Sequence, residues 1–328
     1  MATIKDIARR AGVGVATVSR ALNRSGYVRP ETLTKIEQVA DELGYVPNRQ
    51  ARAMVNGSTQ TFGILIPDMD NALFMRIVRG INDFAYPLGY SLLVMDSRGN
   101  PERERRICRT MQELRVDGLV LFATPGTANL LTTLDRTLPA VVIDRLLPSS
   151  DVPQVSVDHY KGAKDAVGLL LSVCQYPPAM ISGPEQVTSS EARLQGYRDA
   201  LRSAGVSPKD ERIESGGYTY EGGYQAMRGL LTRGRSLDGV FAANDLSALG
   251  ALRAIRDVGL RCPDDVRVVG FDDIEATRYV YPSLTTIRQP MDEIGRVAVD
   301  MLVKRVTGEL VEVDPVLLAG KLIRRESC

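Results

Sequence analysis

Residues 3–23 read TIKDIARRAGVGVATVSRALN, and this stretch decides how the first part of the chain folds. Its apolar residues fall at 4, 7 and 8 and again at 18, 21 and 22, a spacing that predicts two short helices with one buried side each. Thr3 followed by Asp6 predicts a capping box, and Gly12 provides the sharp turn between the helices. A helix-turn-helix of this kind lays its second helix in the major groove of DNA. We therefore predict a DNA-binding head; the alternative is a helical hairpin on the surface of a larger domain.

The charge of the chain is divided as this prediction requires. Residues 1–57 contain nine Lys and Arg against five Asp and Glu, a net charge of +4, whereas the remainder contains 32 against 35, a net charge of −3. A basic head on a mildly acidic body is expected when only one end of a protein meets phosphates.

Composition limits the class of protein. The chain has 328 residues, of which 44% are hydrophobic and 25% charged, which is typical of a globular protein with a small head and about two domains. It has no run of 18 apolar residues and no apolar signal-peptide core, so we expect a cytoplasmic protein without a membrane span. The four cysteines show neither metal-ligand nor redox spacing, and His159 is the single histidine. We therefore expect no metal, no cofactor and no Ser-His-Asp catalysis.

Two further helical segments follow the first pair. From Pro30 to Gly44 apolar residues recur with helical spacing; Pro30 suits the first helical position and Gly44 the position just past the end. The segment 48–56 is compatible with a helix, but nine residues are too few for a stable helix alone in water. It is either a linker or a helix that forms only with support.

From residue 62 onward, apolar strand-like runs alternate with amphipathic helical stretches. The runs lie at 62–67, 90–95, 118–123, 140–145, 179–183, 239–244 and 266–271. This alternation predicts βαβ units with parallel sheets, and the number of strands favours two doubly wound lobes over one.

Head, linker helix and two α/β lobes together resemble the lactose-repressor (LacI-type) family of bacterial transcription regulators. The resemblance covers essentially the whole chain and rests on IKDIARRAGVGVATVSRALN at 4–23, LGYVPN at 43–48, VDGLVL at 116–121, VVGFDD at 268–273 and PSLTTIRQP at 282–290. It implies an all-α head over 1–47, a hinge helix and linker over 48–59, and an α/β core over 60–328 for effector binding and dimerisation.

The resemblance also implies how the core is divided. Its two doubly wound parallel-sheet lobes would be of the periplasmic-binding-protein type, and the chain would cross between them three times. Lobe one would hold about 60–157 plus 287–314, and lobe two about 158–286 plus 315–328.

The head residues expected at DNA are Thr3, Val15, Ala16, Thr17, Ser19, Arg20 and Asn23. Arg20 is the expected base reader because arginine pairs with guanine O6 and N7; the alternative is a phosphate contact. Val15 and Ala16 are small and apolar, so at the DNA they can only contact thymine methyl groups or exclude bulkier groups. Gly14 stands where family members usually have Ser or Thr, which removes one capping or phosphate contact.

The hinge residues expected at DNA are Asn48, Arg49, Ala51 and Met54. By resemblance, the hinge folds on operator DNA and inserts a leucine into the minor groove, a position that Met54 occupies here. Methionine is an accepted wedge between base steps. The alternative is that Met54 only packs against its counterpart in the dimer.

The residues expected to bind a small effector are Phe74, Asp144, Arg145, Arg193, Tyr218, Asn244, Asp272 and Gln289. Several follow strand-like runs, and ligands of doubly wound lobes sit beyond the carboxyl ends of the strands. Carboxylates, amides and guanidinium groups suit a polyhydroxylated ligand, whose hydroxyls both donate and accept, while Phe74 and Tyr218 would stack on its ring. By resemblance, four of them match effector positions of the family, namely Asp144, Arg193, Asn244 and Asp272. Arg145 and Gln289 match positions used in its sugar-binding relatives. For any one of them the alternative is a helix cap or surface salt bridge, and Asp245 and Asp273 are interpreted as caps.

The resulting hypothesis is a ligand-responsive transcriptional repressor of carbohydrate genes that binds a pseudo-palindromic operator as a dimer. The effector would be a small sugar; a purine is the alternative because MATIKDIA and LIRRESC also resemble the purine-repressor branch. Two other classes compete with this hypothesis, an α/β enzyme and a sugar transport receptor. The chain has no Gly-x-Gly-x-x-Gly after the first strand and no P-loop, and its basic head does not fit a transport receptor. One departure from the family is that His159 stands where an Asn is usual.

Overall fold

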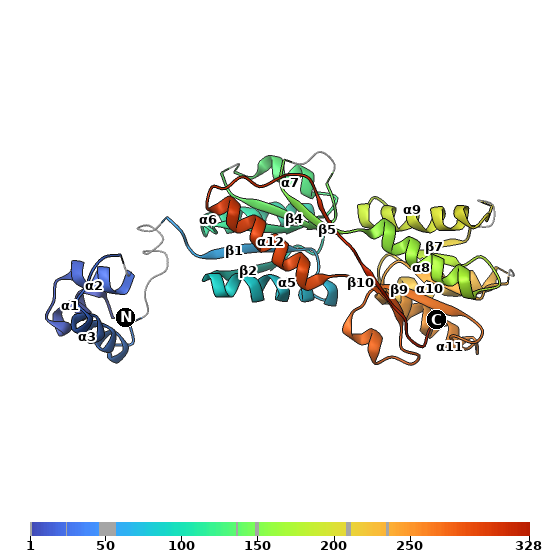
Figure 1. Ribbon diagram of the computed structural model, residues 1–328, viewed down its shortest axis with the longest axis horizontal. Coiled ribbons are helices and arrows are strands. Elements are labelled where there is room, and N and C mark those ends of the chain that lie inside the picture. The colour runs from blue at the N-terminus through green and yellow to red at the C-terminus, as the bar shows by residue number, and fades with distance from the viewer. Residues whose placement is uncertain are drawn as a thin grey trace. The chain divides into compact units, whose positions relative to one another are not determined.

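The structure, a computed structural model, describes residues 2–23, 25–45, 57–135, 137–147, 151–207, 211–233 and 236–328. It forms two compact units, Met1–Thr59 and Gln60–Cys328 (Figure 1). The predicted hinge residues Asn48, Arg49, Ala51 and Met54 lie outside the described residues.

The first unit contains the predicted helix-turn-helix. Its helices are α1 (Ile4–Ala11), α2 (Val15–Asn23) and α3 (Pro30–Glu42). The capping box is confirmed: Thr3 Oγ1 accepts a hydrogen bond from the Asp6 amide at 3.3 Å, and the Asp6 carboxylate accepts one from the Thr3 amide at 3.0 Å. Gly12 ends α1 with φ +70°, the left-handed conformation that favours glycine. Ile7, Val18 and Ile36 form the fully buried centre of this unit.

The end of α3 is also as predicted. Gly44 has φ +57°, its amide donates to the Asp41 carbonyl, and the Tyr45 amide donates to the Ala40 carbonyl. This pair of hydrogen bonds is a Schellman motif, which satisfies carbonyl groups that the last helical turn leaves open.

The second unit is built on two six-stranded sheets. The first lobe holds the sheet β11 (Val316–Leu318), β5 (Gln154–Val157), β4 (Ala140–Asp144), β3 (Gly118–Phe122), β1 (Thr61–Ile66) and β2 (Ser91–Asp96), in this order and all parallel. The second lobe holds β12 (Lys321–Ile323), β10 (Thr285–Arg288), β9 (Arg267–Asp272), β8 (Gly239–Ala242), β6 (Ala179–Ser182) and β7 (Ile213–Ser215). Only β12 runs antiparallel to its neighbour. The two doubly wound lobes are thereby confirmed.

Helices cover both sheets. They are α5 (Ala72–Ala85), α6 (Pro101–Glu113), α7 (Thr127–Thr133), α8 (His159–Val173), α9 (Thr188–Ser203), α10 (Tyr220–Thr232), α11 (Asp245–Asp257) and α12 (Met291–Val306), with the 3-10 turns η1 (Tyr86–Leu88) and η3 (Glu275–Arg278). No helix among the described residues is both long and apolar enough to cross a membrane.

The chain crosses between the lobes after β5, after β10 and between β11 and β12 (Figure 1). Two predicted boundaries are corrected. Arg288 pairs with Asp272 of β9, so β10 belongs wholly to the second lobe, and the return to the first lobe does not begin at 287. Val316–Leu318 pairs with β5, so the first lobe continues past its predicted end at 314.

Helix α12 returns the chain to the first lobe and packs closely on α5. A Cβ atom added to Gly295 would lie 2.6 Å from the Ile81 amide nitrogen and 3.1 Å from Gly80 Cα. This close approach therefore requires glycine in α12.

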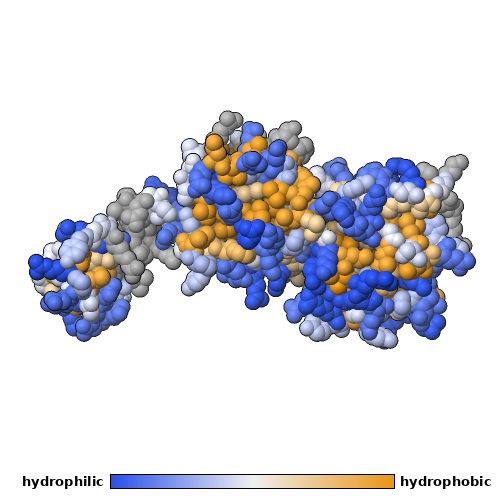
Figure 2. Space-filling model, viewed as in Figure 1, coloured by the Kyte–Doolittle hydropathy of each residue, from blue (hydrophilic) through white to orange (hydrophobic). Residues whose placement is uncertain are grey.

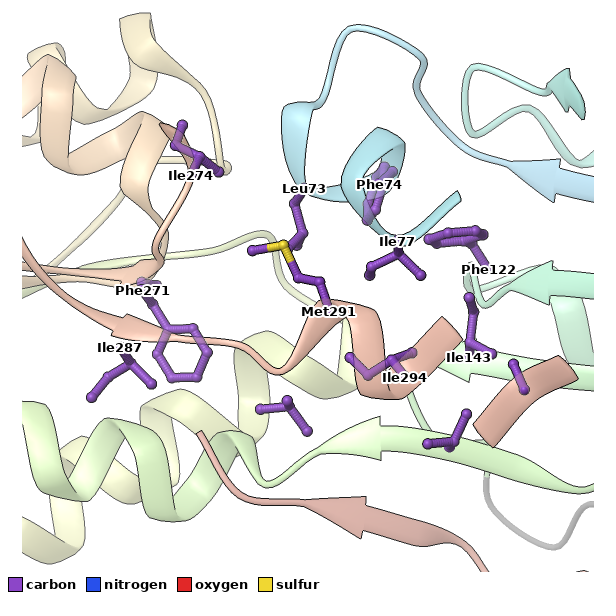
Figure 3. Packing of buried hydrophobic residues seen from close by; sticks show 14 of the residues in the cluster. Leu73, Phe74, Ile77, Phe122, Ile143, Phe271, Ile274, Ile287, Met291 and Ile294 are labelled. Carbon is purple, nitrogen blue, oxygen red and sulfur yellow. The ribbon is translucent and has the colours of Figure 1, made fainter. Parts of the chain in front are cut away.

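A continuous apolar core joins the two lobes (Figure 3). Met291, at the start of α12, lies between Leu73 of α5 and Phe271 of β9. The first lobe contributes Phe122 and Ile143 on the other side of α12. On the visible face of this unit, apolar and polar residues are interspersed over both lobes (Figure 2).

Candidate functional site

A cavity of about 600 Å³ lies where strands of both sheets end at their carboxyl sides. The predicted effector residues that line it are Phe74, Asp144, Arg145, Arg193, Tyr218, Asn244 and Asp272. Gln289 lies behind this layer, where its Nε2 donates to Asp272 Oδ1 at 2.7 Å. The structure therefore brings the whole predicted set together, with Gln289 as a supporting residue. The volume lies within the range of small-molecule sites.

The first lobe contributes a carboxyl group and a guanidinium group from the end of β4. Asp144 is buried and has φ +74°. Arg145 Nη1 donates to the Ala123 carbonyl at 3.0 Å, and its Nε lies 3.4 Å from Asp144 Oδ2. Burial raises the pKa of Asp144, although Arg145 and Arg193 act in the opposite direction. The Asp144 carboxyl group is thus positioned to hydrogen-bond with a ligand hydroxyl.

The second lobe contributes Arg193 from α9, buried and fixed on several sides. Its Nη1 donates to the Ala243 carbonyl, and its guanidinium carbon lies 3.8 Å from the Phe271 ring centroid. Nη2 lies 3.6 Å from Asp272 Oδ1 and 3.2 Å from Nδ1 of His159. The guanidinium plane is therefore held in one orientation at the edge of the cavity.

Asp272, the last residue of β9, is the second carboxyl group of the cavity. Burial raises its pKa to about 8, partly opposed by Arg193. Both contacts described for it, with Gln289 and with Arg193, fall on Oδ1. Among the described residues Oδ2 has no such partner, so it remains available to a ligand.

The aromatic rings of Phe74 and Tyr218 also line the cavity. Phe74 packs edge-on against Phe122 with centroids 5.2 Å apart. The Tyr218 ring lies where a side chain at Gly183 would be, since a Cβ there would come within 2.4 Å of it. Tyr218 Oη is buried and, among the described residues, has no hydrogen-bond partner. Arg145 Nε makes no hydrogen bond there either, but it is ion-paired with Asp144. An unpaired buried hydroxyl is costly, so Tyr218 Oη indicates a position that a ligand would satisfy.

On the helix-turn-helix, α2 presents the predicted DNA face. Val15, Ala16 and Arg20 are exposed, whereas Val18 and Ala21 are buried on the opposite side. Arg20 Nε donates weakly to the Ala16 carbonyl at 3.4 Å, which leaves the terminal nitrogens toward solvent.

The other predicted head residues lie beside this face. Thr3 is exposed, and its hydroxyl accepts the hydrogen bond of the capping box. Thr17 and Ser19 are half-buried, and Asn23 Nδ2 donates to Ser19 Oγ at 3.3 Å. Gly14, which precedes α2, has no side chain to cap it, and its Cβ position is nearly open.

Comparisons with known proteins find matches to both parts of the chain. Residues 3–48 match the family described as bacterial regulatory proteins, lacI family, and residues 157–328 match the periplasmic binding protein-like domain. The ribose operon repressor of Escherichia coli (strain K12) is 34% identical over 100% of both chains. The chain belongs to the LacI family.

Two further relatives cover nearly the full length of this LacI-family chain. The HTH-type transcriptional repressor PurR of Edwardsiella ictaluri is 32% identical over 100% of this chain and 97% of its own. A solved structure of the Lac repressor dimer bound to operator and the anti-inducer ONPF is 29% identical, with a TM-score of 0.89 and coverage of 99% and 98%. Family membership makes the protein a DNA-binding transcription regulator, and the family is not one of enzymes.

Some features of this LacI-family core were wrongly predicted from sequence. Asn244, not Asp245, caps α11: its Oδ1 accepts from the Ser247 amide, and its Nδ2 donates to the Tyr218 carbonyl. Asp245 instead accepts from Thr286 Oγ1 at 2.6 Å and from the Ile274 amide. Both amide atoms of Asn244 are thus engaged within the protein.

Asp273 was also wrongly interpreted as a cap. It is paired with Arg288 at 2.6 Å and with Arg325, and it fixes the turn after β9.

Several cavity residues of this LacI-family chain were missed. The side chains that line the cavity without having been predicted include Asp68, Asp70, Asn71, Arg98, Ser189 and Tyr220. Asn71 carried a signal, because Asn before a helical run predicts an N-cap, and its Oδ1 accepts from the Leu73 amide. Arg98 carried none, since only the fold brings the loop after β2 to the cavity.

Proposed function

We propose that the protein is a transcriptional repressor of carbohydrate-metabolism genes that is controlled by a small sugar. The observation that carries this proposal is the cavity at the strand ends, where Arg145 and Arg193 meet two buried carboxyl groups and the rings of Phe74 and Tyr218. A polyhydroxylated ring needs donors and acceptors together with an apolar surface, and the cavity offers all three. The buried Tyr218 Oη supports a ligand that supplies the missing hydrogen bond.

In this proposal each predicted residue has a distinct role. Asp144 and Asp272 exchange hydrogen bonds with ligand hydroxyls, while Arg145 and Arg193 donate to ring and hydroxyl oxygens. Phe74 and Tyr218 lie against the faces of the ring. Gln289 orients Asp272, and Asn244 supports the Tyr218 backbone.

The operator would be pseudo-palindromic and bound by a dimer in the cytoplasm. The basic head, the exposed α2 face and the relationship to the Lac repressor, a dimer on its operator, support this. Thr3, Thr17, Ser19 and Asn23 would contact phosphates around Arg20, and residues 48–56 would fold as a hinge helix on the operator. Asn48, Arg49, Ala51 and Met54 are proposed for the minor groove.

A purine is the second candidate effector. The similarity to PurR and the pair of aromatic rings in the cavity favour it, because a purine offers a flat face to stack on. Two buried carboxyl groups beside arginines suit hydroxyls better than ring nitrogens, so a sugar stays the leading proposal.

A thermal-shift and calorimetric screen of the full chain tests the effector. Pentoses, hexoses, their phosphates and purine bases would be added separately, and binding at about 100 times Kd should stabilise the folded state by about 2.7 kcal/mol. Asp272→Asn should abolish the thermal shift. Asp264→Asn changes an exposed residue just before the amino end of β9 and should keep it. Stabilisation by purines alone would replace the sugar. A shift that survives in Asp272→Asn would remove that residue from the site.

A further inference from the structure

The only histidine of the chain lies under the cavity and joins its two halves. His159 is the first residue of α8, directly after the first crossing between the lobes, and its side chain is buried. Its Nε2 lies 3.1 Å from the carbonyl oxygen of Asp144 in the first lobe. Its Nδ1 lies 3.2 Å from Nη2 and 3.4 Å from Nε of Arg193 in the second lobe. One imidazole ring therefore contacts a residue of the candidate site on each side.

The chemistry of these partners fixes the protonation of the ring. A guanidinium group can only donate, so Nδ1 must accept from Arg193 and carry no hydrogen. A carbonyl oxygen can only accept, so Nε2 must carry the hydrogen and donate to Asp144. The geometry is satisfied by the neutral Nε2–H tautomer alone. A second hydrogen on Nδ1 would point at the guanidinium and break this contact.

The contact with His159 completes the restraints on Arg193. The Ala243 carbonyl holds Nη1, and the Phe271 ring lies against the guanidinium face. His159 accepts along the edge formed by Nε and Nη2, which prevents rotation within the plane. Among the described residues, one hydrogen of Nη1 then has no acceptor, and it is free for a ligand oxygen.

The Asp144 end of the bridge is equally well defined. Its carbonyl oxygen also accepts from Ser156 Oγ at 2.5 Å, and its backbone has φ +74°. A non-glycine residue in this conformation is strained and persists only where its surroundings hold it. His159 and Ser156 together hold the peptide that orients the Asp144 carboxylate.

We propose that His159 is a positioning residue for effector binding: as the neutral Nε2–H tautomer it sets the orientation of Arg193 relative to Asp144 and so couples ligand affinity to the arrangement of the two lobes. This inference rests on the proposed function of the cavity.

The proposal also predicts a pH dependence of effector binding. Protonation of the ring should release Arg193, so the affinity for the effector should fall at acid pH in the wild type. The charged groups facing the ring are Arg193 from α9, Asp144 and Arg145 from the end of β4, and Asp272 from β9. Burial, and then Arg193, lower the pKa of His159 well below 6.5, so the neutral form persists at neutral pH.

The first test measures the tautomer and protonation state of the His159 ring directly and needs no effector. Because the chain has one histidine, ¹⁵N-histidine labelling of the full protein gives a single imidazole signal pair in NMR. We expect the neutral Nε2–H tautomer at pH 7 and a change in the Nδ1 chemical shift when Arg193→Met removes the donor. A charged ring or the Nδ1–H tautomer at pH 7 would overturn the inference, even if the cavity binds a sugar.

The second test uses variants with D-ribose as the calorimetric probe. His159→Phe keeps a flat ring but loses both hydrogen bonds, and its Kd should rise about tenfold or more, as for loss of a hydrogen bond to a charged group. His159→Asn keeps an amide oxygen as acceptor for Arg193 and should recover most of this affinity, without the acid-dependent weakening of the wild type. Tyr160→Phe, which removes the neighbouring hydroxyl from Asp199, is the matched control.

The outcomes separate the inference from the proposed function. Wild-type affinity in folded His159→Phe protein, or equal pH profiles for wild type and His159→Asn, would overturn the positioning role. Absence of ribose binding in the wild type contradicts ribose as the effector, and the same comparison then uses the compound that the screen identifies. The NMR result decides the tautomer in either case.

Discussion

At the scale of single residues, the cavity is built from backbone conformations that most side chains avoid. Arg98, Asp144, Tyr218 and Asp272 all line it and have φ between +51° and +130°. Such conformations cost free energy and concentrate at sites where geometry matters more than stability. The strand ends thus place side chains toward the ligand at the expense of local strain.

Arg20 is the residue on which operator discrimination should depend. Arg20→Ala should reduce the preference for operator over random DNA by about 1–3 kcal/mol per half-site, because the guanine contact is lost. Weak binding that falls steeply with salt should remain. Fluorescence anisotropy with operator and random duplexes measures both, and Lys35→Ala on α3 controls for the loss of one positive charge. An unchanged preference would make Arg20 a phosphate contact.

His159 should also give a characteristic pH dependence of stability. Its pKa in the folded protein lies well below the value of about 6.5 in the unfolded chain, so unfolding takes up a proton at acid pH. The contribution of His159 to the free energy of unfolding is therefore complete above about pH 7. It is lost as the pH falls below about 6.5, by up to about 1.4 kcal/mol per pH unit. Urea unfolding of the wild type and of His159→Asn from about pH 5 to about pH 8 covers this window and measures the loss. Parallel curves would contradict the prediction.

At the scale of elements, glycine decides how closely helices can pack. Gly295→Ala should destabilise the core by about 1–3 kcal/mol, since the added Cβ meets the backbone of α5 at Ile81. Gly168→Ala is the matched control: it lies exposed inside α8 with open space around it, and it should stabilise by up to about 1 kcal/mol. Thermal unfolding followed by circular dichroism distinguishes the two. Equal shifts would show that α12 adjusts to the extra methyl group.

At the start of α2, by contrast, replacing a glycine should stabilise the fold. Gly14→Ser should stabilise the head by a few tenths of a kcal/mol, because a side-chain oxygen can cap α2 and the Cβ position is open. Gly12→Ser should destabilise it by about 1–2 kcal/mol, since φ +70° suits glycine. Hydrogen exchange of the head amides in the full chain reports both changes. A loss of protection in Gly14→Ser would contradict the capping argument.

The elements also explain how far sequence could predict the fold. Apolar runs predicted seven strands but not β5, β7, β10, β11 and β12. In β5 and β10, buried polar residues interrupt the apolar pattern. Gln154 bonds to both backbone atoms of Leu147, and Thr286 donates to Asp245. These partners lie far enough away in sequence that no local pattern signals them. The site residues that follow strands could be predicted, whereas Arg98 and the role of His159 depend on contacts that only the folded chain makes.

At the scale of the whole molecule, the three crossings make the cavity a joint property of both lobes. Asp144 belongs to the first lobe and Arg193 and Asp272 to the second, so a ligand that contacts all three favours one arrangement of the lobes. A ligand shifts such an equilibrium only by its difference in affinity between the two arrangements. This is the means by which effector binding would control the affinity for DNA.

Operator recognition should require two chains. The exposed face of α2 consists of a few side chains, with Arg20 as its only charged residue, which is too little for specific binding by one head. We expect a sedimenting species of twice the 35.9 kDa chain mass at micromolar concentration, and tight binding only to DNA with two inverted half-sites. A duplex with one half-site scrambled should bind at the nonspecific level, with a smaller salt dependence because fewer phosphates are contacted. A monomeric mass, or equal affinity for the intact and the scrambled duplex, would show that a single head suffices and that twofold symmetry plays no part in recognition.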